Sequence, residues 1–380
     1  YCTRHLNGYY KDEKNTKEKQ QMTDKNFSIL MPLKDRVDYS YRVLSYLDHI
    51  KFPYKIILAD GGEDEKISEV LQDPNNLSNL DYEYIRYPYD TTVSDFYNKM
   101  ADAVLRVDTP TVAVLDNDDF ILSEGITECL KILKDNPDFS SARGAVNNII
   151  VSRQTYGTLT VGRNIYSTFP NSICAPTASE RLKEQTVRFH CNWHNVTRSN
   201  HVKACWQMIR EASPQNIRFT GQIAGYLNTL WGNSHRSDFR WLLHQQGERI
   251  KTEGGTLVDH FPPQDHWIKS DYWLEDFNKT SEVIGVAIAE YDNVSVEEGI
   301  RVFKETYPLK LPDLKELLDK RIKESNLLGY NRKRIDNLQS IVRENKIKEI
   351  QPIGDIVEPS FGSTEELELL SNFLSSAGNK

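Results

Sequence analysis

The clearest pattern in the chain is an alternation of short apolar runs with amphipathic stretches between residues 27 and 135. Runs of five residues rich in apolar side chains predict buried strands, and they cover 27–31 (FSILM), 55–59 (KIILA), 82–86 (YEYIR) and 111–115 (TVAVL). Apolar residues recurring every three or four positions predict helices over 37–47, 93–104 and 123–133, the last with Ser123 as its N-cap. This order is typical of an α/β fold with an open, mostly parallel sheet flanked by helices.

The rest of the chain shows two other patterns. Residues 140–275 are rich in Asn, His, Trp, Tyr and Arg and have few periodic stretches, which indicates irregular, substrate-binding elements. From residue 308 the helical period returns, and Gly329 separates the halves of a predicted helical hairpin over about 311–347. One more short amphipathic helix is expected near the C-terminus. The apolar face of the hairpin predicts packing either on the rest of the chain or on a second copy, and we favour a homodimer.

Composition narrows the classes of function. The net charge of −8 and the pI of about 5.7 argue against a nucleic-acid partner, which requires a basic face. The apolar runs are far shorter than the roughly 20 residues of a transmembrane helix. Five scattered cysteines without a Cys-x-x-Cys pair indicate reduced, cytoplasmic usage. Residues 10–25 are highly charged without a hydrophobic period, which indicates an exposed arm.

The predicted strands end in polar segments, and the carboxyl ends of such strands are where open α/β sheets bind ligands. Three carboxylates, Asp116, Asp118 and Asp119, directly follow the fourth strand. They repel one another unless a cation neutralises them, and carboxylate oxygens favour Mg²⁺ or Mn²⁺. The alternative is an Asp-rich turn. Asp60 and Gly61 follow the second strand, and they fit either a contact to a base or ribose or a tight turn.

Several other catalytic signatures are missing from the sequence. It contains no P-loop, no G-x-G-x-x-G, no H-E-x-x-H and no G-x-S-x-G motif. The spacing of His190, His194, His201 and Cys205 would allow zinc ligands, but no Cys pair accompanies them. We therefore favour a polar loop or a substrate pocket for these residues.

Taken in order, the strand ends resemble the nucleotide-sugar half of a GT-A glycosyltransferase of the family-2 type. The matching segments are FSILMPLKDR, ILADGGEDE, SDFYNKMADAV and VLDNDDF. The resemblance covers about residues 27–150 and extends more weakly to about residue 275, where WGN and FRWLLHQQG are similar to a bacterial subgroup. It implies a GT-A fold with a C-terminal helical extension.

The resemblance also implies roles for individual residues. Asp60 would bind the base, Asp116 would lie near the ribose and the metal, and Asp118 would bind the metal that bridges the diphosphate, with Asp119 orienting the site. The residues expected to contact the donor are Pro32, Asp35, Arg36, Asp60, Gly61, Asp116 and Asn117. The expected ligands of Mn²⁺ or Mg²⁺ are Asp116, Asp118, Asp119 and a downstream histidine, which is His244, His260 or His266; we choose His244.

The implied reaction is transfer of a sugar from a nucleotide-diphosphate sugar, with a UDP-sugar favoured, to a glycan or another hydroxyl acceptor. Inverting members of the family carry a carboxylate base about 100 residues after the metal motif, where this chain has Gln222. Glu211 and Asp238 are the nearest substitutes. Two alternatives remain: a sugar nucleotidyltransferase, and a non-catalytic carbohydrate-binding protein.

The predicted organisation has three parts. Residues 1–26 form a charged arm, 27–275 a GT-A domain with a nucleotide-sugar half (27–150) and an acceptor half (151–275), and 276–380 a mainly helical region. The predicted location is cytoplasmic, or peripheral at the inner face of the membrane.

Overall fold

The computed structural model describes residues 26–73, 75–151, 159–164, 172–190, 192–246, 267–346 and 363–377. Almost all of the predicted N-terminal arm lies outside these residues. The domain boundaries predicted at residues 150 and 275 stay predictions.

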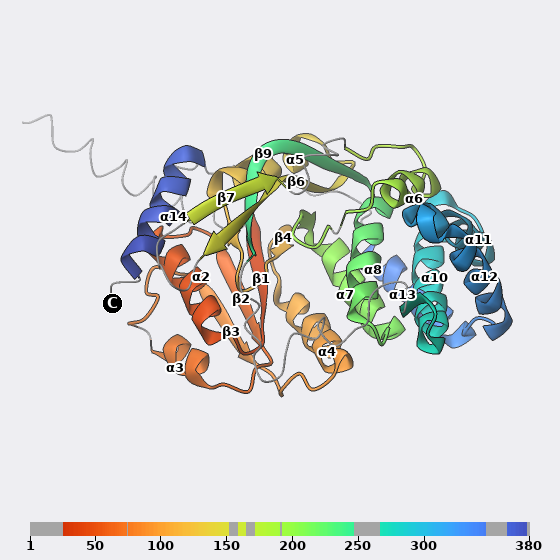
Figure 1. The fold of residues 1–380 in the computed structure, drawn as a ribbon, viewed down its shortest axis with the longest axis horizontal. Coiled ribbons are helices and arrows are strands. Elements are labelled where there is room, and N and C mark those ends of the chain that lie inside the picture. Colours follow the sequence, from red (N-terminus) through yellow and green to blue (C-terminus); the bar gives the residue numbers. More distant parts are fainter. Residues whose placement is uncertain are drawn as a thin grey trace, which may run out of the picture.

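The described strands form one sheet in the order β3-β2-β1-β4-β8-β6-β9-β5, with β7 paired to β6 (Figure 1). Strands β1 to β4 pair in parallel, and the remaining pairs are antiparallel except for β6 with β9. The bounds are β1 (Phe27–Leu33), β2 (Lys55–Asp60), β3 (Tyr82–Arg86), β4 (Thr111–Val114), β5 (Phe120–Ile121), β6 (Phe139–Val151), β7 (Leu159–Asn164), β8 (Val196–Arg198) and β9 (Asn233–Gln246).

The four predicted strands are confirmed as β1 to β4. Three of them, β1, β2 and β4, are covered by helices on both faces, which explains their apolar runs. In β1, Leu30 belongs to one hydrophobic cluster, whereas its neighbours Ile29 and Met31 belong to the other. A strand buried on both faces consists of a continuous apolar run rather than an alternating one.

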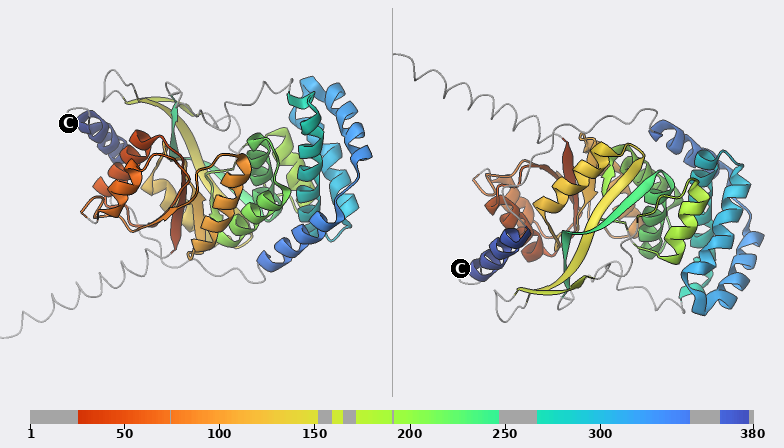
Figure 2. Two further views of the ribbon diagram at one scale, coloured as in Figure 1. Left: turned by 90° about the horizontal axis from the view of Figure 1, so that it is seen from below. Right: turned by 90° about the horizontal axis from the view of Figure 1, so that it is seen from above.

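The helices are α2 (Val37–His49), α3 (Lys66–Gln72), α4 (Val93–Ala103), α5 (Ser123–Asp135), α6 (Ala178–Val187), α7 (Ser199–Ala212), α8 (Ile217–Leu230), α10 (Asp271–Asp292), α11 (Val296–Thr306), α12 (Lys315–Ser325), α13 (Arg332–Asn345) and α14 (Ser363–Ala377). Some helices pack on the faces of the sheet, and the C-terminal helices α10 to α13 pack on other helices. Helices α10 to α12 lie at one end of the molecule and α14 at the other (Figures 1 and 2). The predicted class, an α/β sheet flanked by helices with a C-terminal helical region, is confirmed. None of the described helices has the length and apolar character needed to cross a membrane.

The expectation of irregular structure across 140–275 is wrong for much of the described part. This segment contains α6, α7 and α8 as well as β6 and β9. Eleven of the fourteen residues of α8 are buried, including polar ones such as Thr220 and Asn228. A helix buried on almost every side has no polar face, so the amphipathic period that identifies a helix in the sequence is missing.

The predicted N-cap of α5 is also wrong. Ser123 is the first residue of the helix, and its N-cap, Leu122, makes no side-chain capping bond. The carboxylate of Glu366 on α14 takes this role: its two oxygens accept hydrogen bonds from the Ser123 backbone N–H at 2.9 and 3.1 Å. A remote carboxylate therefore caps the helix that follows the acidic segment.

The predicted C-terminal hairpin corresponds to α12 and α13. The apolar face of α13, formed by Ile335, Leu338 and Val342, is buried, and this helix packs against α7 and α10. The chain itself therefore covers the face on which the homodimer prediction rested. The homodimer stays a prediction without that support.

Candidate metal and donor site

The acidic segment lies where β4 ends, beside the carboxyl ends of β1 and β2. Leu30 of β1 pairs with Val114 of β4 and with Ile57 of β2. Because these strands are parallel, the loops that follow them lie at one edge of the sheet. The structure thus brings together the three segments that the sequence analysis selected.

A group suited to a metal ion forms at this edge. Within the described residues, Asp116, Asp119 and His194 each offer a ligand atom, and these atoms lie within 4.8 Å of one another. The Nε2 atom of His194 lies 3.7 Å from Oδ2 of Asp116 and 3.6 Å from Oδ2 of Asp119. Two oxygens and one imidazole nitrogen form a donor set that suits Mn²⁺ better than Mg²⁺, which prefers oxygen alone.

A second contact fixes the orientation of His194. Its Nδ1 lies 2.9 Å from the backbone carbonyl oxygen of Val114, the last residue of β4. A carbonyl only accepts hydrogen bonds, so Nδ1 carries a proton and Nε2 is the ring nitrogen that faces the two carboxylates. This arrangement is common for histidines that bind metal ions.

Asp119 is the buried member of the group, with a side chain that is 0% exposed. One of its oxygens accepts a hydrogen bond from the Gln245 backbone N–H at 3.0 Å, and His244 Nδ1 lies 3.0 Å from both oxygens. The hydrogen bond to Asp119 and the nearby carboxylates raise the pKa of His244 to about 9. His244 is therefore in the site, where it contacts a candidate ligand, and its predicted role as a ligand stays a prediction.

Asp116 is the more accessible carboxylate. Its Oδ1 accepts a hydrogen bond from the Trp193 indole at 3.2 Å. Desolvation, together with the carboxylates of Asp119 and Asp118, raises the pKa of Asp116 to about 6. Its side chain is 42% exposed, so water screens part of this effect.

Asp118 and Asn117 contact residues outside the group formed by Asp116, Asp119 and His194. Asp118 forms an ion pair with Arg36 at 2.6 Å, and Asn117 donates a hydrogen bond to Ser40 Oγ at 2.8 Å. Both Asp35 and Arg36 have left-handed backbone conformations, with φ of 52° and 55°, which non-glycine residues adopt at a cost. The loop after β1 thus presents Arg36 to the acidic segment.

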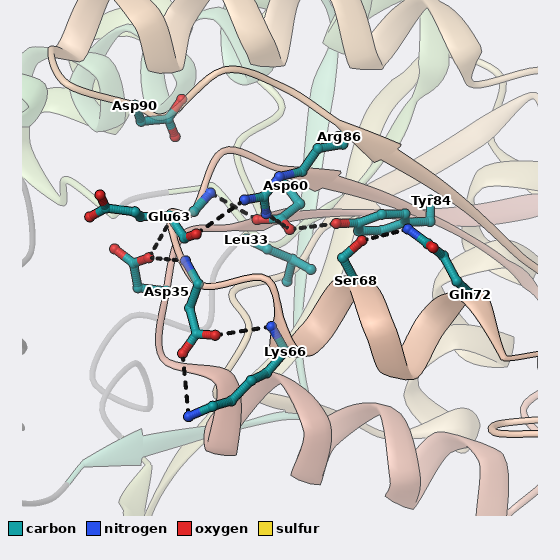
Figure 3. A network of polar contacts seen from close by, with 12 residues as sticks. Leu33, Asp35, Asp60, Glu63, Lys66, Ser68, Gln72, Tyr84, Arg86 and Asp90 are labelled. Atoms are coloured by element: carbon teal, nitrogen blue, oxygen red, sulfur yellow. Dashed lines mark hydrogen bonds and ion pairs between the residues drawn. The ribbon is translucent and has the colours of Figure 1, made fainter.

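The predicted base-binding residue, Asp60, is buried and already engaged (Figure 3). Its carboxylate accepts hydrogen bonds from the Gly62 backbone N–H at 2.8 Å, from the Tyr84 hydroxyl at 2.7 Å, and from Arg86. These bonds occupy three of its roughly four acceptor sites. Asp60 therefore holds the loop after β2 in place.

Neighbouring residues restrict the same loop further. Asp35 Oδ1 accepts a hydrogen bond from the Glu63 backbone N–H at 2.8 Å, which links the loops after β1 and β2. A Cβ atom at Gly61 would lie 2.5 Å from Oδ1 of Asp90, which is buried and paired with Lys99. Only glycine fits this position without displacing that buried ion pair.

The structure does not bring either predicted base to the acidic segment. Glu211 lies on α7 and accepts a hydrogen bond from Asn337 of α13 at 3.1 Å. Asp238 is exposed on β9, six residues before His244, a separation of about 20 Å along an extended strand. Their catalytic role stays a prediction, and so does the role of Pro32, the sixth residue of β1. His260 and His266 lie outside the described residues.

Sequence reasoning weighed His194 only as a zinc ligand and did not connect it with the acidic segment. The four-residue spacing of His190 and His194 was visible, but it suggested zinc. In the structure His190 and His201 are buried, and desolvation lowers the pKa of each to about 3, whereas His194 faces the acidic segment. The tryptophan before it, which bonds Asp116, was a signal that became interpretable only with the fold.

Comparison with known proteins identifies no family. No protein-family description matches the chain, and no curated protein does. Similar solved structures include S. aureus TarS 1-349, which shares 14% identity over 85% of this chain and 93% of that chain, with a TM-score of 0.44. The complex of TarS 1-349 with UDP-GlcNAc has the same identity and coverage and a TM-score of 0.46. Mannosyl-3-phosphoglycerate synthase from Rubrobacter xylanophilus shares 12% identity over 62% of this chain and 70% of that chain, with a TM-score of 0.33. At these values the likeness carries no argument about function.

Proposed function

We propose that this protein is a metal-dependent glycosyltransferase that moves a sugar from a nucleotide-diphosphate sugar to a hydroxyl group of a glycan. The observation that carries the proposal is the convergence of Asp116, Asp119 and His194 directly after β4, beside the loops after β1 and β2. The four sequence segments that resemble the glycosyltransferase family supply these loops in the same order. We further propose a UDP-sugar as donor and a cytoplasmic location.

In this mechanism Asp116, Asp119 and His194 would hold Mn²⁺ or Mg²⁺. When bound, the ion would supply positive charge that stabilises the leaving diphosphate. Arg36 lies beside the acidic segment, so its guanidinium can turn from Asp118 to a phosphate oxygen, which suits its geometry equally well. Asp60 and Asp35 fix the loops that would enclose the nucleoside. The mechanism assigns no residue as base.

Product analysis with UDP-sugars and Mn²⁺ tests this proposal. A glycosyltransferase transfers the sugar slowly to water or faster to an acceptor, and it releases UDP in both cases. A nucleotidyltransferase instead needs UTP and a sugar phosphate and releases pyrophosphate. Asp116→Asn should abolish both UDP release and the rise in melting temperature caused by UDP with Mn²⁺. Asp313→Asn, at an exposed position of the C-terminal region, is the matched control. Donor binding without turnover across a panel of acceptors would favour a carbohydrate-binding protein instead.

A further inference from the structure

The tip of the hairpin between α12 and α13 exposes an apolar segment. Leu327 is 87% exposed, Leu328 is 56% exposed and Tyr330 is 41% exposed. Gly329 lies between them with φ of +68°, and a Cβ atom at this position would have no atom within 4 Å. The two leucine side chains therefore face solvent.

The base of the tip is fastened to the body of the protein. The Asn278 side chain donates a hydrogen bond to the Gly329 carbonyl at 2.7 Å, and the Asn331 backbone N–H donates one to Glu282 at 2.8 Å. Lys304 Nζ lies 5.0 Å from the centre of the Tyr330 ring. The hairpin packs through other residues, among them the buried Leu318 and Leu338. The two tip leucines are thus presented on a fixed support with more than half of each side chain exposed.

The hairpin that carries this tip is basic, although the whole chain is acidic. Residues 315–346 contain nine Lys and Arg against five Asp and Glu, whereas the whole chain contains 47 against 55. The acids next to the tip are paired, Glu324 with Arg321 at 2.5 Å and Asp336 with Arg332 at 3.2 Å. Among the residues that the structure describes, Lys323 and Lys333 lie on either side of the two leucines, and neither belongs to the ion pairs of this hairpin.

We propose that this tip, residues 326–333, is a membrane-docking element that inserts Leu327 and Leu328 into an anionic lipid surface. Exposed leucines contribute by burial in the acyl boundary, and flanking lysines contribute by attraction to anionic headgroups. A protein partner fits less well, because three side chains cannot supply the roughly 800 Å² per partner of a stable interface. With the proposed transferase function, docking here would hold the enzyme at a membrane surface.

Vesicle sedimentation with the full chain tests the docking. We expect binding to vesicles of phosphatidylcholine with 30% phosphatidylglycerol, weakened by 0.5 M NaCl and by removal of the anionic lipid. The double variant L327E/L328E should bind at least tenfold more weakly. Leu105→Glu is the matched control, because Leu105 is 57% exposed on a different part of the surface and its replacement should leave binding unchanged. Equal melting temperatures would show that both variants are folded.

Three results would overturn the docking: no sedimentation of the parent protein with anionic vesicles, equal binding by L327E/L328E, or equal loss with Leu105→Glu. Light scattering adds a fourth, since a parent dimer that the double variant converts to a monomer would mean that a second copy covers the tip. None of these measurements uses enzyme activity. A failure of the docking therefore leaves the proposed transferase function untouched, and the reverse also holds.

Discussion

Replacing His194 tests which histidine completes the metal site. His194 Nε2 lies 3.7 and 3.6 Å from the Asp116 and Asp119 oxygens, less than twice a metal–ligand bond of about 2.1 Å, so one ion can bridge His194 to either carboxylate. The three ligand atoms all lie within 4.8 Å of one another, so small side-chain rotations would let one ion bind all three. The hydrogen bond to Val114 already orients the ring. Removing an oriented ligand should therefore cost more than removing a residue that only supports a ligand.

The expected size of the effect follows from that difference. His244 bonds Asp119, which keeps its bond from the Gln245 backbone when His244 is lost. Loss of such a supporting residue weakens metal binding by about 10- to 100-fold, or about 1.4–2.7 kcal/mol. His244→Ala should fall in this range. His194→Ala should exceed it, with a loss above about 100-fold.

Isothermal titration of each variant with Mn²⁺ in the presence of UDP measures both losses. Melting temperatures without metal provide the control for folding. The reasoning is refuted if His244→Ala loses more affinity than His194→Ala, since His244 would then be the third ligand, as the sequence suggested. Equal Mn²⁺ affinity of His194→Ala and the parent would show that His194 is not a metal ligand.

Three further predictions concern stability. Glu366→Gln should lower the free energy of unfolding in urea by roughly 1–2 kcal/mol, because it weakens the cap of α5, whereas Glu368→Gln, at an exposed position of the same helix, should have no effect. Gly285→Ala should cost about 1–3 kcal/mol by the same measurement, since its Cβ would lie 2.7 Å from the Ile300 backbone nitrogen where α10 crosses α11. Burial lowers the pKa of His201 to about 3, so between pH 6.5 and 3 the unfolded chain binds a proton that the folded protein does not. The free energy of unfolding therefore decreases as the pH is lowered through this range. In His201→Phe, the decrease in the free energy of unfolding from pH 7 to pH 5.5 should be smaller by roughly 1 kcal/mol than in the parent, as measured by urea unfolding at both pH values.

The sequence predicted the parts of the fold whose signals are local. Strands β1, β2 and β4 were visible because burial on both faces leaves an apolar run, and α4 because its buried residues recur at helical spacing. The acidic segment was visible because three carboxylates in four residues after such a strand are unusual. Helix α8 was not visible, since its buried polar residues hide the period.

The partners within the site were beyond sequence reasoning. His194 lies 75 residues after Asp119, and nothing in either segment indicates that they meet. The pairing of Arg36 with Asp118 depends on the left-handed turn at Asp35 and Arg36, a conformation that arginine does not favour. Such contacts depend on how the strands are ordered in the sheet, and a pattern in one segment does not contain that order.

Three remote carboxylates show how the C-terminal helices are coupled to the starts of earlier helices. Asp276 of α10 accepts hydrogen bonds from the Gln215 and Asn216 backbone N–H groups before α8, and Asp292 accepts them from Ala178 and Ser179 at the start of α6. Glu366 of α14 does the same for α5. Buried N–H groups at helix starts are costly without acceptors, and in each of these helices a residue beyond position 275 satisfies some of them. Because α5 directly follows Asp119 and β5, the C-terminal helix α14 contributes to the rigidity of the acidic segment, although it supplies no ligand to it.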